Sequence, residues 1–251
     1  NKNKVTELLN DEPINAGFAS RVEVGQPLGV FYGWVTDGIF QSEAEVRAHA
    51  TQPGAASGDI RFKDINGRDA NGELTGQPDG VINADDRTII GNPWPEWEGG
   101  VTNALSWRGI DLSAFVQFSL GNDVYNAMRV YTDAFGSGGD NNSIRALDRW
   151  RPDNPNTQQP RAVWGDPNQN TRDSDRFVED GSYVRLKNLV IGYTLPESLN
   201  RRLGYRRLRL YVQGQNLWTA TDYSGFDPEV NYAGFFNVTA TTEIYTLPQT
   251  R

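Results

Sequence analysis

The chain has 251 residues, of which 37% are hydrophobic and 22% charged, with a formal net charge of -8 and no cysteine. The lack of cysteine excludes disulfides, thiol catalysis and Cys-ligated metal, and the negative charge disfavours general nucleic-acid binding. No apolar run approaches the ~18 residues that a membrane-spanning helix needs, so a helical membrane protein is excluded as well.

The first region contains neither an export signal nor a histidine-based site. Its opening residues, Asn1–Leu9, carry no apolar segment and no cleavage site of the secretory type. The single histidine, His49, ends the polar stretch that begins at Glu43, which is typical of a solvated helix. The sequence therefore offers no His relay and no multi-His metal site.

An acidic loop lies at residues 64–86. If Arg68–Pro78 is set aside as an insertion, carboxylates and amides fall at loop positions 1, 3, 5, 9 and 12 with a glycine at 6, which is the EF-hand spacing. The candidate Ca²⁺ ligands are Asp64, Asn66, Asp79, Asn83 and Asp86. The insertion interrupts the loop where it should be tightest, and its last position carries Asp rather than Glu. We therefore favour the alternative, a loop of Asx turns with solvated carboxylates.

A long strand with two different faces is predicted at Ile110–Leu120. Its even positions are all apolar, and its odd positions are mostly polar. Such alternation is typical of a strand with one apolar and one wet face, and eleven residues at ~3.3 Å each are enough to cross a bilayer. Because Gly100–Trp107 leads into it through Arg108-Gly109, residues 99–120 are predicted to form a hairpin. The register sets Trp107 opposite Ile110, Leu105 opposite Leu112 and Val101 opposite Val116.

A second hairpin of long strands is predicted within residues 182–218. In Arg207–Leu217, apolar side chains alternate with arginine, tyrosine and glutamine, so one face is strongly wet. In Ser182–Thr194 the alternation loses contrast after Asn188, which predicts a bulge or an inner face packed on another part of the molecule. The link Leu195–Arg206 is expected to contain a short helical turn.

The links between these strands alternate in length. Two short links, Arg108-Gly109 and Leu195–Arg206, alternate with long segments before 99, at 121–181 and at 219–251. Outer-membrane barrels show this asymmetry, with short periplasmic turns and long extracellular loops. We therefore interpret 121–181, with a short helix, and 219–251 as extracellular loops. Residues 1–98 are then barrel strand(s) with an extracellular loop region, and the aromatic-rich run Gly29–Phe40 fits either role.

Several motifs occur in the same order as in a known family. They are Val24–Trp34, Asp37–Phe40, Gly58–Gly67, Asp86–Asn92, Arg149–Pro155, Val184–Pro196, Gly214–Leu217 and Gly225–Glu229. Together they resemble the C-terminal third of SusC/RagA-type TonB-linked outer-membrane transporters. The resemblance implies an all-β fold, namely the C-terminal portion of a 22-stranded antiparallel transmembrane β-barrel with long extracellular loops. The sequence is then expected to be a fragment without the plug and the closing strand.

The same resemblance implies a function and a set of partners. Such transporters import oligosaccharides or peptides across the bacterial outer membrane with energy delivered through TonB, and they make no bonds, so no enzyme activity is expected. The expected partners are the rest of the barrel and its plug, a SusD-like surface lipoprotein, the TonB complex acting through the missing plug, outer-membrane lipid and the substrate. Nucleic acid is not among them.

Aromatic and amide side chains in the long segments are the candidate substrate-binding residues, because sugar rings and peptide side chains bind on exposed aromatic faces. They are Tyr131, Trp150, Trp164, Tyr223, Asn231 and Tyr232. The alternative is that they pack the loops on one another or on a lid protein.

The charged and aromatic residues near the strands have structural interpretations. Trp107 and Tyr193 are predicted to lie in a membrane-interface girdle. Arg209 and its neighbour Arg207 are expected to contact carboxylates of the plug. The cluster Arg145, Arg149 and Arg151 is expected to pair with the local carboxylates of Asp148 and Asp153.

Two other functions remain open. One is a soluble β-rich carbohydrate-binding or adhesin module with a calcium loop, and the other is a surface glycosidase. Strand length and the asymmetry of the links favour the importer over the soluble module. A glycosidase needs two carboxylates at a defined separation in a cleft, which the sequence does not show.

Overall fold

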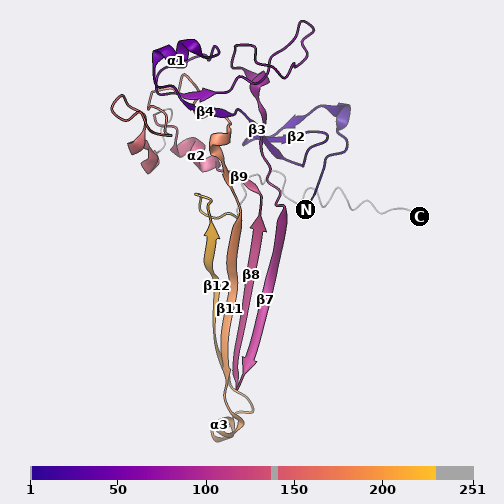
Figure 1. Cartoon of the computed structure of the whole chain (residues 1–251). Coiled ribbons are helices and arrows are strands. Elements are labelled where there is room, and N and C mark those ends of the chain that lie inside the picture. Colours follow the sequence, from indigo (N-terminus) through magenta and orange to yellow (C-terminus); the bar gives the residue numbers. More distant parts are fainter. Residues whose placement is uncertain (1, 137–140, 230–251) are drawn as a thin grey trace, which may run out of the picture. The chain divides into compact units, whose positions relative to one another are not determined.

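The computed structural model describes residues 2–136 and 141–229, which divide into two compact units (Figure 1). Unit 1 contains residues 94–123 and 180–228, and unit 2 contains residues 3–93 and 124–179. The described chain is built mainly of β-strands with a few short helices, which confirms the all-β class. None of these helices has both the length and the apolar sequence needed to span a membrane.

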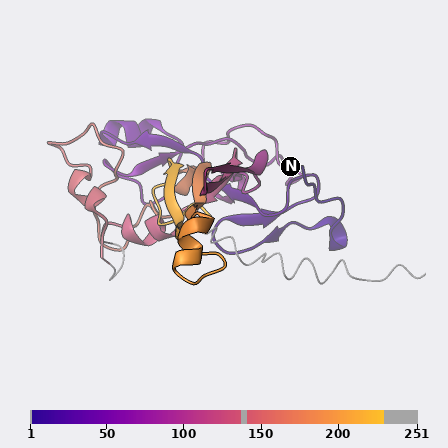
Figure 2. The ribbon, with the colours of Figure 1, turned by 90° about the horizontal axis from the view of Figure 1, so that it is seen from below.

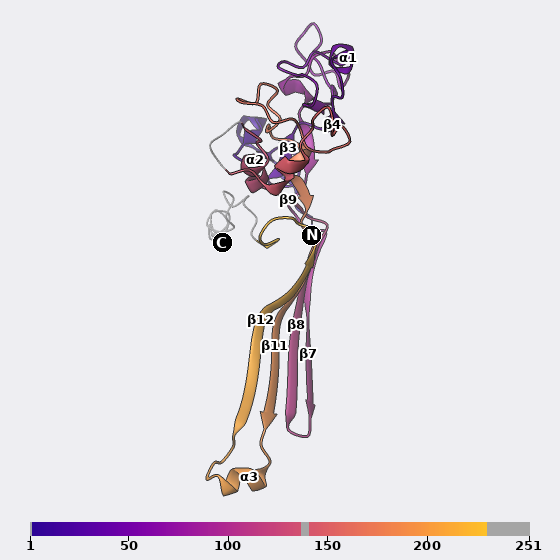
Figure 3. The ribbon, with the colours of Figure 1, turned by 90° about the vertical axis from the view of Figure 1, so that its left-hand side faces the viewer.

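Unit 1 is a four-stranded antiparallel sheet in the order β12-β11-β8-β7. Its strands are β7 (Trp97–Trp107), β8 (Ile110–Leu120), β11 (Tyr183–Thr194) and β12 (Arg209–Thr221), with 11, 11, 12 and 13 residues. The helix α3 (Glu197–Arg202) lies in the link between β11 and β12. The β7–β8 turn and α3 lie at the same end of the sheet (Figure 3), the end that faces the viewer in Figure 2.

The β7–β8 hairpin has the register expected from the sequence. Trp107 pairs with Ile110, Leu105 with Leu112 and Val101 with Val116. In the turn, Arg108 and Gly109 have φ angles of 49° and 88°. Both values are in the left-handed region that a type I′ turn requires, although arginine is an uncommon choice there. The Arg108 guanidinium lies 4.9 Å from the centre of the Trp107 ring, a cation–π contact that favours this conformation.

A bulge explains the loss of alternation in the second hairpin. The pairing of β11 shifts between Leu186 and Asn188 on both of its neighbours, so that Lys187 is an extra residue relative to β8. On the other side, β12 carries an extra residue near Asn216, whose φ angle of 51° is left-handed. Because of the bulge, the odd-numbered residues Leu189, Ile191 and Tyr193 lie on the apolar face of the sheet, as the even-numbered Leu186 does before it. The bulge expected from the sequence is thus confirmed.

Unit 2 consists of short strands and helical turns. One sheet has the order β1 (Ile14–Asn15), β2 (Ser20–Val22), β3 (Val30–Gly33) and β6 (Thr88–Gly91), and a second pairs β4 (Thr36–Ile39) with β5 (Ile60–Phe62). A third pairs β9 (Asp123–Tyr125) with β10 (Val178–Asp180). The helical elements are η1 (Leu9–Asp11), α1 (Glu43–Ala48), η2 (Ala84–Asp86), α2 (Ala127–Thr132), η3 (Ile144–Asp148) and η4 (Asp175–Phe177).

Two apolar clusters form the core of unit 2. The first contains Ala19, Phe31, Tyr125, Ala127 and Phe177. The second contains Ile39, Ile60, Phe62 and Ile82, with Trp34, Ala50 and Trp150 packed against it. Both clusters join residues from the segment before β7 to residues from the segment between β8 and β11. The two long segments of the sequence therefore fold together as one unit.

The region before residue 97 differs from the expectation of a barrel strand. Within residues 2–96 the strands have two to four residues, whereas a strand that crosses a membrane needs ≈ 9–11. The run Gly29–Phe40 forms β3 and β4 instead of one long strand. Val30, Phe31 and Phe40 are buried in the unit, and Gly38 has a φ angle of 89°, which interrupts the extended backbone.

Candidate functional site

The sheet of unit 1 has one continuous apolar face. Strand pairing aligns its side chains in rows that run across all four strands. The three clearest rows are Trp107–Ile110–Tyr193–Leu210, Leu105–Leu112–Ile191–Val212 and Val101–Val116–Leu186–Trp218. Many of these side chains are exposed, among them Leu105 at 59% and Val212 at 77%. An apolar surface of this kind, repeated over the full length of four strands, is suited to an apolar solvent.

Trp107 and Tyr193 lie in the row next to the short links. They are on the apolar face and flank Ile110, with which both of them pair. Trp107 is 66% exposed and Tyr193 is 42% exposed. This placement is the one that a girdle of aromatic residues at a membrane interface requires.

The opposite face of the sheet is polar and carries an ion pair. Arg209 on β12 donates from Nε to Oδ1 of Asp111 on β8 at 2.9 Å, and its Nη2 binds the other carboxylate oxygen. The pair spans β11 at Gly192, which is directly opposite Asp111. Arg209 was expected to contact the plug, whereas its partner here belongs to the same sheet.

A second arginine on the polar face binds the segment that follows β12. Arg185 is 5% exposed, and its guanidinium donates to both carboxylate oxygens of Asp227 at 2.7 and 3.2 Å. Its Nε donates to Oγ1 of Thr219 at 2.8 Å. Two of the sequence motifs, Val184–Pro196 and Gly225–Glu229, are thus joined by one bidentate contact.

The candidate substrate-binding aromatics are in different environments. Tyr131 on α2 is 53% exposed and Trp164 is 83% exposed. Trp150 is partly buried: it packs against the second apolar cluster, and its indole donates to Oε1 of Gln41 at 3.0 Å. Tyr223 belongs to unit 1, where a side chain at Gly225 would collide with its ring. Asn231 and Tyr232 lie outside the described residues.

The side chains of the 64–86 loop bind backbone amides. Asp64 accepts from the N–H groups of Asp79 and Gly80, and Asn66 accepts from those of Gly67 and Gly76. Asp79 accepts from Val81, and Asn83 from Asp85. The buried Asp86 accepts from Ile65, Asn66 and Asn83. In the described part of the chain, no three His, Cys, Asp or Glu side chains are grouped as a metal ion would require.

The arginine cluster at 145–151 pairs with carboxylates, though with a different set from the expected one. Arg151 binds Asp153 at 3.1 Å as predicted. Arg145 lies 3.7 Å from Asp133, which the sequence did not suggest. Asp148 accepts from Asn154 and Thr157 instead of from an arginine.

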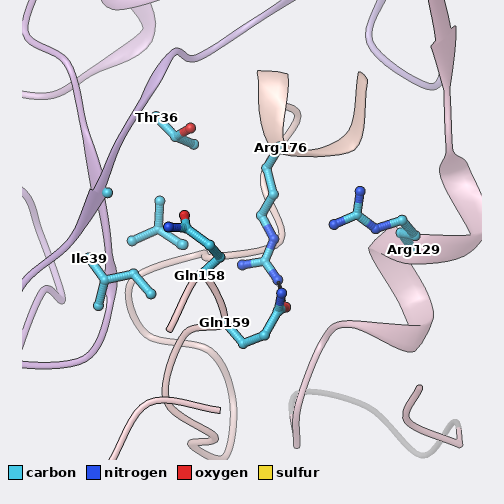
Figure 4. Close-up of a pocket in the computed structure, with 8 residues that line it drawn as sticks. Thr36, Ile39, Arg129, Gln158, Gln159 and Arg176 are labelled. Carbon is cyan, nitrogen blue, oxygen red and sulfur yellow. Dashed lines mark hydrogen bonds between the residues drawn. The ribbon is translucent and has the colours of Figure 1, made fainter. Parts of the chain in front are cut away.

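A pocket that the sequence did not predict lies within unit 2 (Figure 4). Its volume is about 240 Å³, and its lining residues are Thr36, Gly38, Ile39, Ile60, Arg129, Gln158, Gln159 and Arg176. Arg176 projects toward its centre, between Gln158 and Arg129. The lining residues come from sequence positions up to 140 apart, so no local sequence pattern predicts the pocket. Arg176 was not singled out from the sequence, although an arginine beside the apolar Phe177 could have indicated a buried charge.

Comparison with known proteins gives a consistent result. No family model matches the chain. Among curated proteins it is 37% identical, over 97% of its length, to TonB-dependent receptor P3 of Formosa agariphila. It is 28% identical, over 60% of its length, to TonB-dependent receptor SusC of Bacteroides thetaiotaomicron. These matches cover 24% and 14% of the two relatives, so the chain spans about a quarter of their length or less.

Solved structures agree with the sequence comparison. The chain matches the RagAB peptide transporter with a TM-score of 0.63 and 29% identity, over 86% of this chain and 22% of that one. It matches the RagAB peptide importer in its open-open state with a TM-score of 0.65 and 26% identity, over 90% of this chain and 22% of that one. By sequence and by structure, the chain is therefore a relative of the TonB-dependent receptors of the SusC/RagA type.

Proposed function

We propose that this chain forms part of the wall and of the extracellular loops of a TonB-dependent outer-membrane importer of large nutrients. The observation that carries the proposal is the exposed apolar face of the four-stranded sheet, where apolar rows run across strands of 11 to 13 residues. Exposure of such a face to water is unfavourable over its whole area. Contact with lipid on the apolar face and with water on the polar face gives each surface a solvent of matching polarity.

The sheet is one segment of a closed barrel in this proposal. Its edge strands are β7 and β12, and unpaired backbone groups on an edge are not tolerated in lipid. Both edges therefore pair with further strands of the longer protein, in a barrel of 22 strands. The turn at Arg108-Gly109 and the link with α3 face the periplasm, and the long segments that make up unit 2 face the cell exterior.

The relatives support a proposal for the cargo and the partners. The solved relative RagAB is named as a peptide transporter and importer. We propose peptides or oligosaccharides as the substrates of this receptor, with Tyr131 and Trp164 as exposed aromatic contacts. A SusD-like lipoprotein at the cell surface and TonB, acting through the plug of the complete protein, are its proposed partners. Transport of this kind involves no bond-making step by these residues.

One substitution tests the membrane wall. In the full-length receptor, Val116→Arg places a charge on the apolar face near the middle of β8. We expect a loss of ~2–4 kcal/mol in the free energy of unfolding from lipid vesicles, the cost of arginine near the bilayer midplane. The control is Gln213→Arg on the polar face, which should cost little. Equal stability of Val116→Arg and wild type would argue for water on both faces and against the proposal.

A further inference from the structure

The pocket of unit 2 contains a buried guanidinium with incomplete hydrogen bonding. Arg176, on η4, donates from Nη2 to Oε1 of Gln159 at 2.8 Å. Its Nε and Nη1 are buried and have no hydrogen-bond partner among the described residues. Buried donors without an acceptor are uncommon in native proteins, and each one calls for a physical explanation.

The charge of Arg176 is also only partly balanced. Burial lowers the pKa of its guanidinium to about 10, so the group stays a cation at neutral pH. The carboxylates of Asp133 and Asp166 act on it through space, but neither accepts from its Nε or Nη1. Two further cations, Arg129 and Arg145, oppose it. A desolvated cation in this position is stabilised by an anion that reaches it directly.

The neighbouring carboxylates are already engaged with other groups. Asp133 has a fully buried side chain and binds Arg129 at 3.0 Å, and it also accepts from the hydroxyl of Ser143 at 2.6 Å. Glu179 binds Arg129 at 2.8 Å. Arg129 thus has two anionic partners, whereas Arg176 beside it has none in hydrogen-bond contact among residues 2–136 and 141–229. The positive charge that remains available in the pocket belongs to Arg176.

The shape of the pocket limits what it can hold. A volume of about 240 Å³ is below the ≈ 300–1,000 Å³ of a drug-sized ligand site, so it accommodates one residue of a larger molecule. Ile39 and Ile60 supply an apolar wall for a carbon skeleton, and Gln158 and Gln159 supply amide groups beside the guanidinium (Figure 4).

We propose that this pocket binds one carboxylate-bearing residue of the imported ligand, with Arg176 as the partner of the carboxylate. The proposal rests on the proposed importer function. The guanidinium donates from its free N–H groups to the carboxylate oxygens, and the apolar wall contacts the rest of the residue. The shared chemistry is a carboxylate on a compact monomer, and it has two sources, an acidic amino acid in a peptide or a uronic acid in a glycan.

Two matched pairs of probes distinguish these sources. For the peptide arm, N-acetyl-glutamate amide is compared with N-acetyl-glutamine amide. For the glycan arm, methyl glucuronide is compared with methyl glucoside. Binding to the purified full-length receptor is measured by ligand-observed NMR, which detects weak affinities. We expect at least one acidic probe to bind and its neutral counterpart to bind at least tenfold more weakly.

Three variants connect binding to the pocket. Arg176→Gln removes the cation and is expected to weaken binding of the acidic probe at least tenfold. Gln158→Glu, at an exposed position on the pocket wall, supplies an internal carboxylate and is expected to abolish probe binding while the protein stays folded. Arg151→Gln removes an equal charge from a residue that pairs with Asp153 and should leave binding unchanged.

Two results would overturn the inference. One is the absence of binding by both acidic probes to the folded wild-type receptor, which would mean that the pocket does not take a carboxylate ligand. The other is binding of the acidic probe by Gln158→Glu with the same affinity as by the wild type. This test remains valid even if Arg176→Gln does not fold. Because binding is measured without transport, the outcome is independent of the Val116→Arg test, and failure of one proposal is distinguishable from failure of the other.

Discussion

Arg209 and Asp111 form an ion pair across a strand that contributes no side chain at the crossing point. Asp111 is opposite Gly192 on β11, and Arg209 reaches it from β12 on the far side of that strand. A Cβ atom at Gly192 would lie 2.6 and 2.7 Å from the carboxylate oxygens of Asp111 and would collide with Arg209. The glycine therefore makes room for a contact between strands that are not neighbours.

This arrangement predicts a strong effect of a very small substitution. In the full-length receptor, Gly192→Ala should cost about 1–3 kcal/mol in the free energy of unfolding, because the methyl group overpacks the crossing. Asp111→Ala alone should cost much less than Gly192→Ala, since both charged side chains are partly exposed. In the double variant the two losses should be less than additive. Urea unfolding in lipid measures all three, and simple additivity would show that Gly192 does not act through the pair.

A second prediction concerns the contact between Arg185 and Asp227. Asp227→Ala leaves a nearly buried guanidinium without its bidentate partner, which should cost about 1–3 kcal/mol. It should also make residues 222–229 more susceptible to chymotrypsin, which cleaves after Tyr223 and Phe226. Asp222→Ala, at an exposed position three residues after Thr219, is the control. Equal digestion of both variants would mean that Arg185 does not anchor this segment.

A third prediction concerns a buried amide network in unit 2. Asn168 has no exposed surface, donates to the carbonyl of Ile60 and to Asn170, and accepts from Gln52 at 2.6 Å. Asn168→Ala leaves these buried groups without partners and should destabilise unit 2 by about 1–3 kcal/mol. Hydrogen exchange at β5 reports the loss. The exposed Asn141→Ala is the control, and similar exchange in the two variants would contradict the role of Asn168 in holding β5.

A fourth prediction is a response of the 64–86 loop to acid. Hydrogen bonds from Arg68 hold the pKa of Asp85 below its usual range. Hydrogen bonds from backbone amides, chiefly that of Glu73, likewise lower the pKa of Asp69. A lowered pKa in the folded state stabilises the loop above the ordinary carboxyl pKa, and this stabilisation is lost as the pH falls through the lowered value. Pepsin cleavage within 64–86 should therefore rise as the pH falls from about 4 to about 2. The Asp85→Asn variant should be cleaved readily over the whole of this pH range. A wild-type loop whose cleavage does not change with pH would contradict the prediction.

A fifth prediction concerns calcium in the same loop. The oxygens of Asp64, Asn66 and Asp86 already accept backbone hydrogen bonds. We expect millimolar Ca²⁺ or EDTA at neutral pH to leave Glu-C cleavage after Glu73 unchanged, because backbone amides close the loop without a cation. Protection by Ca²⁺ that Asp64→Asn abolishes would instead favour the EF-hand interpretation.

Local periodicity was enough to predict the two hairpins. Alternation in Ile110–Leu120 and its mirror in Gly100–Trp107 fixed which residues pair, because a shift of one position would move every apolar side chain to the wrong face. The loss of alternation after Asn188 was likewise a local signal of the bulge. These features depend on residues that are neighbours in sequence or joined by a tight turn, so the sequence alone contains them.

Contacts between distant segments were decided only by the tertiary structure. Trp150 was a candidate for substrate contact from the sequence, whereas in the structure it packs against the second apolar cluster of unit 2. The pairs Arg185–Asp227 and Arg209–Asp111 join positions 42 and 98 residues apart. Likewise, the pocket around Arg176 exists only because two long segments fold together. Period-two alternation records which face of a strand is apolar, but it carries no information about which distant side chain completes a charge or fills a cavity.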